Sequence, residues 1–236
     1  MLVHLQSFAH LRVSRMVPAF PLVVLATGGH AQVRRRGFVR TLLPGQHTIV
    51  PALEHIDLHL EGSAYQEASC TLEIADNAKP SHTSSLRHWI SQQVFLQPAH
   101  TWNAAFVSDV LHTSALHVRR SLFSEGATLT EICRTQRLMR LLFEILNGDL
   151  PTAQVRTHAV WPPSGDLDSS FYDWFGLSLQ SAHYIAQRRH WGLHPTSHGY
   201  AQVAKTRPSA RQDPELWRGR CRDGDAPAPP HQPTSF

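Results

Sequence analysis

The spacing of apolar residues divides the chain into two regions with different periods. From Met16 to about Ile74 the apolar residues form short runs or alternate with polar ones, as they do over 56–60, and a period of two is typical of strands. Turns such as Gly28-Gly29 and Pro44-Gly45 separate these runs. Several short strands joined by glycine and proline turns predict a small β-barrel or sandwich. The expected strands cover 22–26, a basic strand pair within 32–43, 47–51 and 56–60.

Beyond residue 85 the apolar residues recur with a helical period. The longest stripe starts at Leu129 and runs to Ile145, and Asn147-Gly148 then ends the helix. A segment rich in serine, threonine and proline precedes this region and predicts a linker. The expected helices cover 86–94, 104–111, 115–123, 129–146, 152–159, 164–174 and 179–186.

The run from Ser114 to Gly126 has the features of a DNA-recognition helix. Ser114 can cap the helix start, Val118 and Leu122 fall on one face, and Arg119 and Arg120 project from another. A guanidinium can bridge O6 and N7 of guanine or clamp a phosphate. For the pair alone, an ordinary amphipathic helix with solvated arginines is the favoured explanation, but the motif spacing around it favours DNA recognition.

That spacing resembles the AraC/XylS family of bacterial transcription activators, most closely the branch that controls acid resistance and type III secretion. The match covers Leu86 to Tyr184. A first motif is carried by Trp102, Val110, Leu111, Ser114, Val118, Arg120, Leu122, Glu125, Gly126, Thr128, Ile132 and Arg137. A second copy is carried by Val155, Trp161, Leu167, Phe171 and Phe175-Gly176-Leu177-Ser178.

The resemblance implies an α+β chain in which a small β-rich, cupin-like domain precedes an all-α double helix-turn-helix domain. Two recognition helices, bridged by the 129–146 helix, would enter successive major-groove segments of DNA. The expected parts are a disordered leader at 1–15, a β-rich effector or dimerisation domain at 16–75, a linker at 76–84, the double helix-turn-helix at 85–190, and a disordered basic, proline-rich tail at 191–236.

The second helix-turn-helix departs from the family pattern. Arg156 stands where a small residue is usual, Val160 where glycine is usual, and Leu179 where proline is usual. A buried arginine without a partner is costly, and a β-branched residue is strained where φ is positive. We therefore expect the second half to be poorly formed. Its helix is also acidic, with Asp166, Asp168 and Asp173, so most DNA-binding energy is expected from the first half.

Residue-by-residue matching to the family assigns the expected DNA contacts. Base edges would be contacted by Leu116, Arg119 and Arg120, with Ala115 and His117 close by, while Thr113 and Ser114 would lie near phosphate. The second half would contribute Ser164, Gly165, Asp166 and Ser169, since an aspartate can accept a hydrogen bond from cytosine N4. Arg137 and Arg140 are expected to brace the bridging helix.

Composition and charge agree with a nucleic-acid partner without requiring one. The chain has 236 residues, of which 42% are hydrophobic, as in globular proteins. Its 22 lysines and arginines outnumber its 18 acidic residues, and Arg34, Arg35, Arg36 and Arg40 crowd one stretch. The apolar stretch 16–27 resembles a signal peptide only faintly, since Pro18 and Pro21 interrupt it.

Other chemistry finds little support in the sequence. Three cysteines without C-x-x-C spacing suggest neither disulfides nor a zinc site, and they fit a reducing compartment. His55, Asp57 and His59 could face one side of a strand as metal ligands, but no further ligand completes a familiar spacing. Solvated or titrating histidines are favoured instead, which leaves acid sensing open. No catalytic motif is found, so no enzyme, cofactor or metal is expected.

The sequence thus predicts a cytoplasmic, nucleoid-associated bacterial transcription regulator that binds double-stranded DNA. Activation through RNA polymerase is implied by the family alone. A homodimer, a small effector and a regulatory chaperone remain open as partners, and no membrane association is expected. One alternative is a degenerate family member that acts through protein–protein contact without reading DNA; another is a cupin-like metal enzyme within 16–75.

Overall fold

The computed structural model describes residues 1–74, 85–148, 150–151, 154–158, 161 and 165–188, without the side chains of 156, 158 and 188. These residues belong to one compact unit, Met1–Gly192. The expected linker at 76–84 and tail at 191–236 lie outside the described residues, as do Val160 and the Arg156 side chain.

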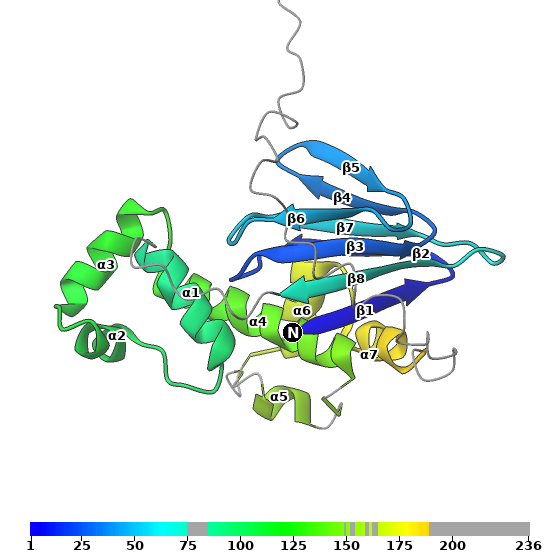
Figure 1. The fold of residues 1–236 in the computed structure, drawn as a ribbon. Helices are drawn as coiled ribbons and strands as arrows, with labels where there is room; N and C mark the ends of the chain where they lie inside the picture. The colour runs from blue at the N-terminus through cyan, green and yellow to red at the C-terminus, as the bar shows by residue number, and fades with distance from the viewer. Residues whose placement is uncertain (75–84, 149, 152–153, 159–160, 162–164, 189–236) are drawn as a thin grey trace, which may run out of the picture. The chain divides into compact units, whose positions relative to one another are not determined.

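Within the described residues the N-terminal part consists of two four-stranded antiparallel sheets (Figure 1). One sheet has the order β1-β8-β3-β6 and the other β2-β7-β4-β5. The strands are β1 Leu2–Ser7, β2 His10–Met16, β3 Leu22–Gly28, β4 Ala31–Arg35, β5 Phe38–Leu42, β6 His47–Val50, β7 Ile56–Glu61 and β8 Ala68–Ile74. Both sheets bury alternate residues in one common core, so the expected sandwich is confirmed.

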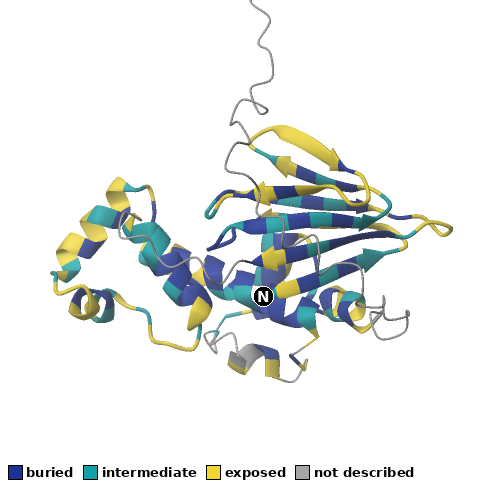
Figure 2. Cartoon of the chain, viewed as in Figure 1, coloured by how far each residue is buried: buried dark blue, intermediate teal, exposed yellow. Residues whose placement is uncertain are grey.

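The prediction of a disordered leader at 1–15 is wrong, because β1 and β2 occupy it. Strand β1 pairs with β8 and strand β2 pairs with β7. Val3 and Leu5 in β1, and Leu11 and Val13 in β2, are buried at alternate positions (Figure 2). Each run has only two such apolar positions between polar residues. An alternation this short does not identify a strand when its sheet partner is unknown.

The strand pair predicted within 32–43 is a hairpin of β4 and β5. Its two connecting residues, Arg36 and Gly37, have φ of 43° and 83°. Positive φ at both central positions is the requirement of the tightest common hairpin turn, and glycine meets it without strain.

Helices make up the remaining described chain. They are α1 Leu86–Leu96, α2 Ala104–Val110, α3 Ala115–Ser124, α4 Leu129–Asn147, α5 Val155–His158, α6 Leu167–Phe175 and α7 Leu179–Arg188. Side chains of Ser85, Asn103, Ser114, Thr128 and Asp166 accept backbone N–H bonds at the starts of α1, α2, α3, α4 and α6. Gly148 and Gly176, at φ 81° and 66°, end α4 and α6.

The helices contribute to two separate hydrophobic cores. Helices α1, α2 and α3 bury residues such as Ile90, Val107 and Val118 against the first turns of α4. The rest of α4, together with α6 and α7, is buried in the same core as both sheets. Helix α4 therefore belongs to both cores, with Ile132 in the smaller and Leu142 in the larger one.

The expectation that the second helical half packs poorly is not met by α6 and α7. Leu167, Phe171, Phe175 and Ala182 are completely buried. Their apolar faces are covered by the sandwich, because α6 packs on β2 and α7 on β1. The sequence pattern of the helices alone does not show this partner.

Polar contacts between β2 and α6 fix this packing. At a β-bulge, Arg15 donates a hydrogen bond to the carbonyl of Asp173, and its guanidinium lies 5.7 Å from the centre of the Trp174 ring. In return, the Trp174 indole nitrogen donates to the Arg15 carbonyl at 3.0 Å. We call these reciprocal contacts of Arg15, Asp173 and Trp174 the β2–α6 clasp.

Candidate nucleic-acid interface

Helices α2 and α3 form a helix-turn-helix whose turn is held by its own backbone. The Thr113 amide donates to the carbonyl of Ser108 at 2.9 Å, and His112 takes a φ of 50° between the helices. Ser114 then starts α3 by accepting a hydrogen bond from the His117 amide at 3.1 Å. Ser114 is exposed, and Thr113, directly before it, is half-buried.

The buried face of α3 rests on a small core of its own. Val118 and Leu122 are 0% and 2% exposed, and they pack with Val107 of α2 and Val94 of α1. The opposite face is therefore presented by a helix that cannot roll without breaking this core.

The exposed face of α3 carries the residues expected to contact DNA. Leu116, His117, Arg119 and Arg120 are exposed, and Ala115 is half-buried. Within the described part of the chain, neither Arg119 nor Arg120 has a hydrogen-bond or ion-pair partner. Two uncommitted guanidiniums on an exposed helix can bind phosphates or the acceptor edge of guanine.

Two further arginines brace the helical region from inside, in line with the expectation for Arg137 and Arg140. Arg137 donates to the carbonyls of Pro98 and His100, at 3.1 and 3.0 Å, and so ties the α1–α2 connection to α4. Arg140 pairs with Glu144 at 2.6 Å.

Glu125 has a structural role that the sequence analysis missed. Its carboxylate accepts hydrogen bonds from the amides of Leu86 and Arg87, at 3.0 and 2.8 Å. This carboxylate thereby fixes the start of α1 to the end of α3. The sequence shows Glu125 only as a motif position, because its partners lie almost 40 residues away.

The region expected to form the second helix-turn-helix presents a different surface. Asp166 caps α6, and Ser169 donates its hydroxyl to the Asp166 carboxylate at 2.6 Å. Gly165 is half-buried, and Ser164 lies outside the described residues. The exposed positions of α6 are Asp168, Ser169, Tyr172 and Asp173, and the helix contains no lysine or arginine. This face repels phosphate.

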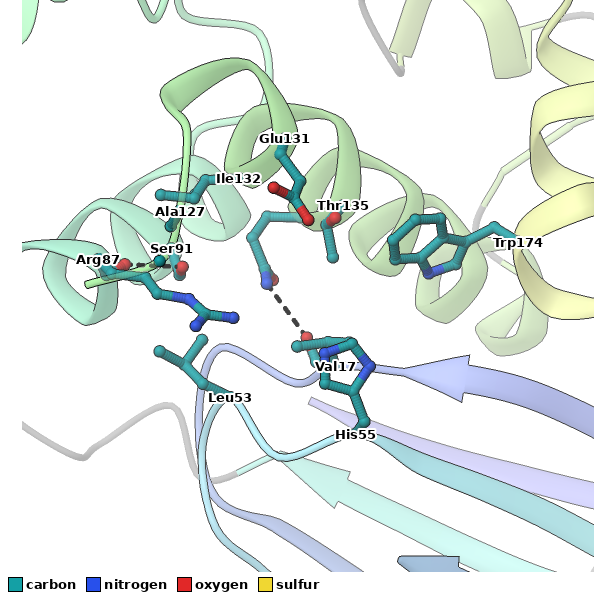
Figure 3. A pocket seen from close by; sticks show the side chains of 12 residues that line it. Val17, Leu53, His55, Arg87, Ser91, Ala127, Glu131, Ile132, Thr135 and Trp174 are labelled. Atoms are coloured by element: carbon teal, nitrogen blue, oxygen red, sulfur yellow. Dashed lines mark hydrogen bonds between the residues drawn. The ribbon is translucent and has the colours of Figure 1, made fainter. Parts of the chain in front are cut away.

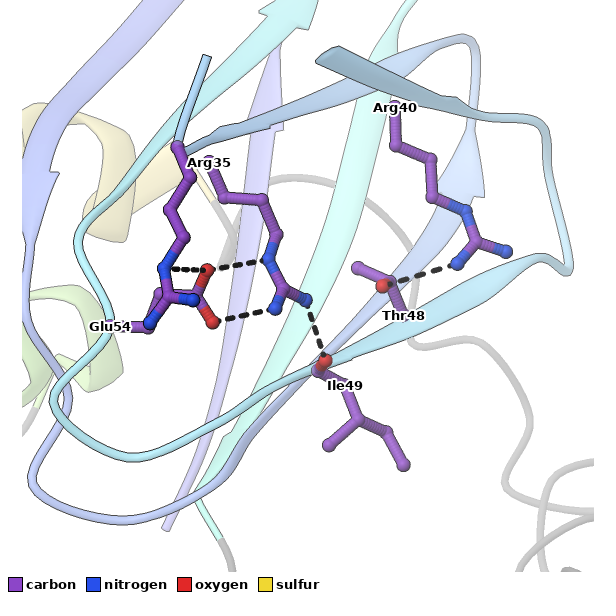
Figure 4. A network of polar contacts seen from close by, with 6 residues as sticks. Arg35, Arg40, Thr48, Ile49 and Glu54 are labelled. Atoms are coloured by element: carbon purple, nitrogen blue, oxygen red, sulfur yellow. Dashed lines mark hydrogen bonds and ion pairs between the residues drawn. The ribbon is translucent and has the colours of Figure 1, made fainter. Parts of the chain in front are cut away.

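Several arginines of the arginine-rich stretch at the β4–β5 hairpin make contacts within the sandwich (Figure 4). The Arg35 guanidinium binds both oxygens of Glu54, at 2.7 and 2.6 Å, and Arg36 lies 3.4 Å from the same carboxylate. Arg40 donates to Thr48 at 3.3 Å. Glu54 is buried, so a good part of this positive charge neutralises an internal carboxylate.

A hollow of about 380 Å³, part of it open to solvent, lies between the sandwich loops and helices α1, α4 and α6 (Figure 3). Val17, Leu53 and His55 line it from the sandwich. The helices contribute Arg87, Ser91, Glu131, Ile132, Thr135, Gln136 and Trp174, and the α3–α4 connection contributes Gly126 and Ala127. Gln136 donates to the Val17 carbonyl at 3.1 Å across it. The lining thus mixes cationic, anionic and apolar groups.

Asp57 and His59, two of the candidate metal ligands, have other surroundings. Asp57 accepts hydrogen bonds from the Arg12 guanidinium and the Arg15 amide. Burial, and then the nearby Arg12, lower the pKa of His59 below its usual 6.5. In the ranges that the structure describes, no three histidine, cysteine or acidic side chains are placed to hold a metal ion.

The two described cysteines are buried within the protein. Burial raises the pKa of Cys70 to about 12 and also raises the pKa of Cys133. Both thiols therefore stay protonated and poorly reactive at neutral pH.

None of the helices in the described ranges is long and apolar enough to cross a membrane.

The known proteins that match this chain are solved structures. No protein-family model and no curated protein sequence matches it. Several crystal structures of ToxT from Vibrio cholerae do match. ToxT with a bound unsaturated fatty acid is 10% identical, and the match covers 78% of this chain and 94% of ToxT with a TM-score of 0.56. A structure of ToxT in a P21 crystal form is 10% identical, and the match covers 78% of this chain and 97% of ToxT with a TM-score of 0.57.

The third structure is ToxT bound to (E)-4-(8-methylnaphthalen-1-yl)but-3-enoic acid. It is 9% identical, and the match covers 79% of this chain and 98% of ToxT with a TM-score of 0.59. Since identities this low establish the fold alone, the conclusion is a structural one. The chain has the two-part fold of ToxT, an AraC/XylS-family protein, and the resemblance to that family seen in its motifs is confirmed at the level of the fold.

Proposed function

We propose that this protein is a sequence-specific regulator of transcription that binds double-stranded DNA, as AraC/XylS regulators do. The observation that carries the proposal is the exposed face of α3. There, Arg119 and Arg120 have no partner among the described residues and stand on a capped helix that has its own core. An α-helix of this width fits the major groove, where arginine is the commonest reader of guanine.

The contribution of the two helical halves is unequal in this proposal. Helix α3 supplies the base contacts, and the backbone amides at its start, with Thr113 and Ser114 beside them, supply a phosphate contact. Helix α6 offers carboxylates and no cation, and its clasp with β2 joins it to the sandwich. We therefore assign α6 a supporting part, with at most a cytosine contact from Asp166.

Cellular context enters the proposal through the family resemblance. On that basis the protein acts in the bacterial cytoplasm, on the nucleoid, as an activator that recruits RNA polymerase. A homodimer through the sandwich and a regulatory chaperone fit the same scheme. We assign a small effector to the hollow between sandwich and helices, and ToxT has been crystallised with an unsaturated fatty acid. Arg87 and His55 would face the acidic group of such a molecule.

Removal of the two arginines tests the DNA-binding proposal. Duplexes are first selected from a random library by the full-length protein. Arg119→Ala and Arg120→Ala should each weaken binding to the selected duplex by about 1 to 3 kcal/mol and relax its sequence preference, because a bidentate base contact is lost. Titration by gel shift at several salt concentrations measures both the affinity and the salt dependence.

The matched control is Arg12→Ala, which removes the same charge from an exposed position on β2. This variant should bind the selected duplex like the unaltered protein. If Arg119→Ala and Arg120→Ala also leave the affinity and the salt dependence unchanged, α3 does not read DNA. Failure to select any duplex would favour the alternative of a family member that acts through protein contact.

A further inference from the structure

The exposed face of α3 also carries two large apolar side chains that take no part in the packing of the fold. Leu116 is 56% exposed and Phe123 is 83% exposed. Neither side chain belongs to either of the hydrophobic cores formed by the described residues. Large apolar groups gathered on one exposed face commonly mark a contact surface.

Helix geometry places this apolar pair between the two arginines. Residues seven apart lie on nearly the same line of a helix, since each residue turns by about 100°. Relative to Leu116, Phe123 lies about 20° to one side, Arg119 about 60° to the same side and Arg120 about 40° to the other. Leu116 and Phe123 therefore form an apolar line flanked by a guanidinium on each side.

The charges around this line indicate what covers it. Helix α3 has no acidic residue, and the Glu125 carboxylate that follows is engaged by the amides of α1. An apolar protein surface would leave the two flanking guanidiniums without counter-charges. The major groove offers partners for the guanidiniums and for the apolar side chains. Phosphates and guanine acceptors can bind the guanidiniums, and the C5-methyl of thymine is an apolar group.

We propose that Leu116 and Phe123 recognise thymine methyl groups on either side of the bases that Arg119 and Arg120 contact. This proposal rests on the DNA-binding function proposed above and adds a base preference and a further contact residue, Phe123. Seven residues of helix span about 10 Å, the length of about three base-pair steps. The preferred site therefore contains two thymines about three steps apart, with guanine between or beside them.

Removal of single methyl groups from the DNA tests the assignment. In a duplex selected by the full-length protein, each thymine is replaced in turn by deoxyuridine, which lacks only the C5-methyl. For two thymines we expect binding to weaken about fourfold, the effect of exposing one buried carbon. In Leu116→Ala one of these two effects should vanish, and in Phe123→Ala the other, as measured by fluorescence anisotropy.

Phe38→Ala is the matched control, because Phe38 on β5 is 59% exposed and lies outside the helical region. It should retain both deoxyuridine effects. Because Leu116 and Phe123 are exposed, their variants should melt at the temperature of the unaltered protein.

The outcomes separate this inference from the broader proposal. If no duplex is selected, DNA binding and the thymine assignment both fail. If a duplex is selected and its binding depends on Arg119 or Arg120, but deoxyuridine has no effect, the thymine assignment alone is overturned. Deoxyuridine effects that persist in both alanine variants overturn it as well.

Discussion

On the outer face of strand β7, His59 lies among charged side chains from three strands. Arg12 stands opposite it on β2, Arg34 projects from β4, and Asp57 and Glu61 precede and follow it on β7. Burial and Arg12 dominate and lower the pKa of His59 in the folded protein. Between that lowered value and about 6.5, the unfolded chain takes up a proton that the folded protein does not bind.

The protein should therefore lose part of its stability as the pH falls from 7 to 5. In His59→Gln this contribution is absent, so its free energy of unfolding should fall less over the same interval. Urea unfolding at closely spaced pH values measures the difference. His30→Gln, which removes an exposed histidine before β4, controls for the loss of a histidine. A His59→Gln variant that loses as much stability as the unaltered protein would contradict the argument.

Residue roles could be predicted where they depend on local spacing. Ser114 as a cap and the outward direction of Arg119 and Arg120 follow from positions on one helix, and the structure shows both. The ion pair between Arg35 and Glu54 could not be predicted, because 19 residues, including strands β5 and β6, separate them in the sequence. Phe123 was also missed, since a helical stripe identifies buried residues and says nothing about an apolar residue left exposed.

At the scale of elements, the clasp between β2 and α6 is a contact whose strength can be measured. Trp174 lies over the Arg15 guanidinium and donates its indole N–H to the Arg15 carbonyl. Trp174→Ala should lower the free energy of unfolding by about 2 kcal/mol, since it removes a half-buried ring and one hydrogen bond.

Tyr172→Ala is the control on the same helix, because Tyr172 is 58% exposed. Its effect in urea unfolding should stay within about 0.5 kcal/mol. Equal losses in the two variants would show that the clasp adds nothing beyond the removal of an aromatic residue.

Helices were more predictable than strands in this chain, for a physical reason. The long stripe and the Asn147-Gly148 stop set the bounds of α4 within the sequence itself. Strands β1 and β2 gain their stability from β8 and β7, about 65 and 45 residues further along the chain. A short alternating run without its partner gives little local signal, so both strands were mistaken for a leader.

At the scale of the whole molecule, the shared core joins the second helical half to the sandwich. Leu167, Phe171 and Phe175 are buried together with residues of both sheets. In a fragment of residues 85–190, helices α1, α2 and α3 should stay folded on their own core. Helices α6 and α7 should lose the sandwich surface that covers their apolar faces. Hydrogen exchange measured by mass spectrometry should show rapid exchange of α6 and α7 amides in this fragment.

The reference is a fragment of residues 1–190, which keeps the sandwich and should protect α6 and α7. Rapid exchange in both fragments would mean that the second half is intrinsically loose, as its departures from the family pattern first suggested. Equal protection in both would show that the sandwich is dispensable for its folding.

Helix α4 is an unbroken rod of 19 residues with one end embedded in each core. Such a rod has no internal joint at which a displacement could be absorbed. Because α4 packs on β1 and also supports helices α1 to α3, a shift of β1 against α4 would move the helices that carry Arg119 and Arg120 as well.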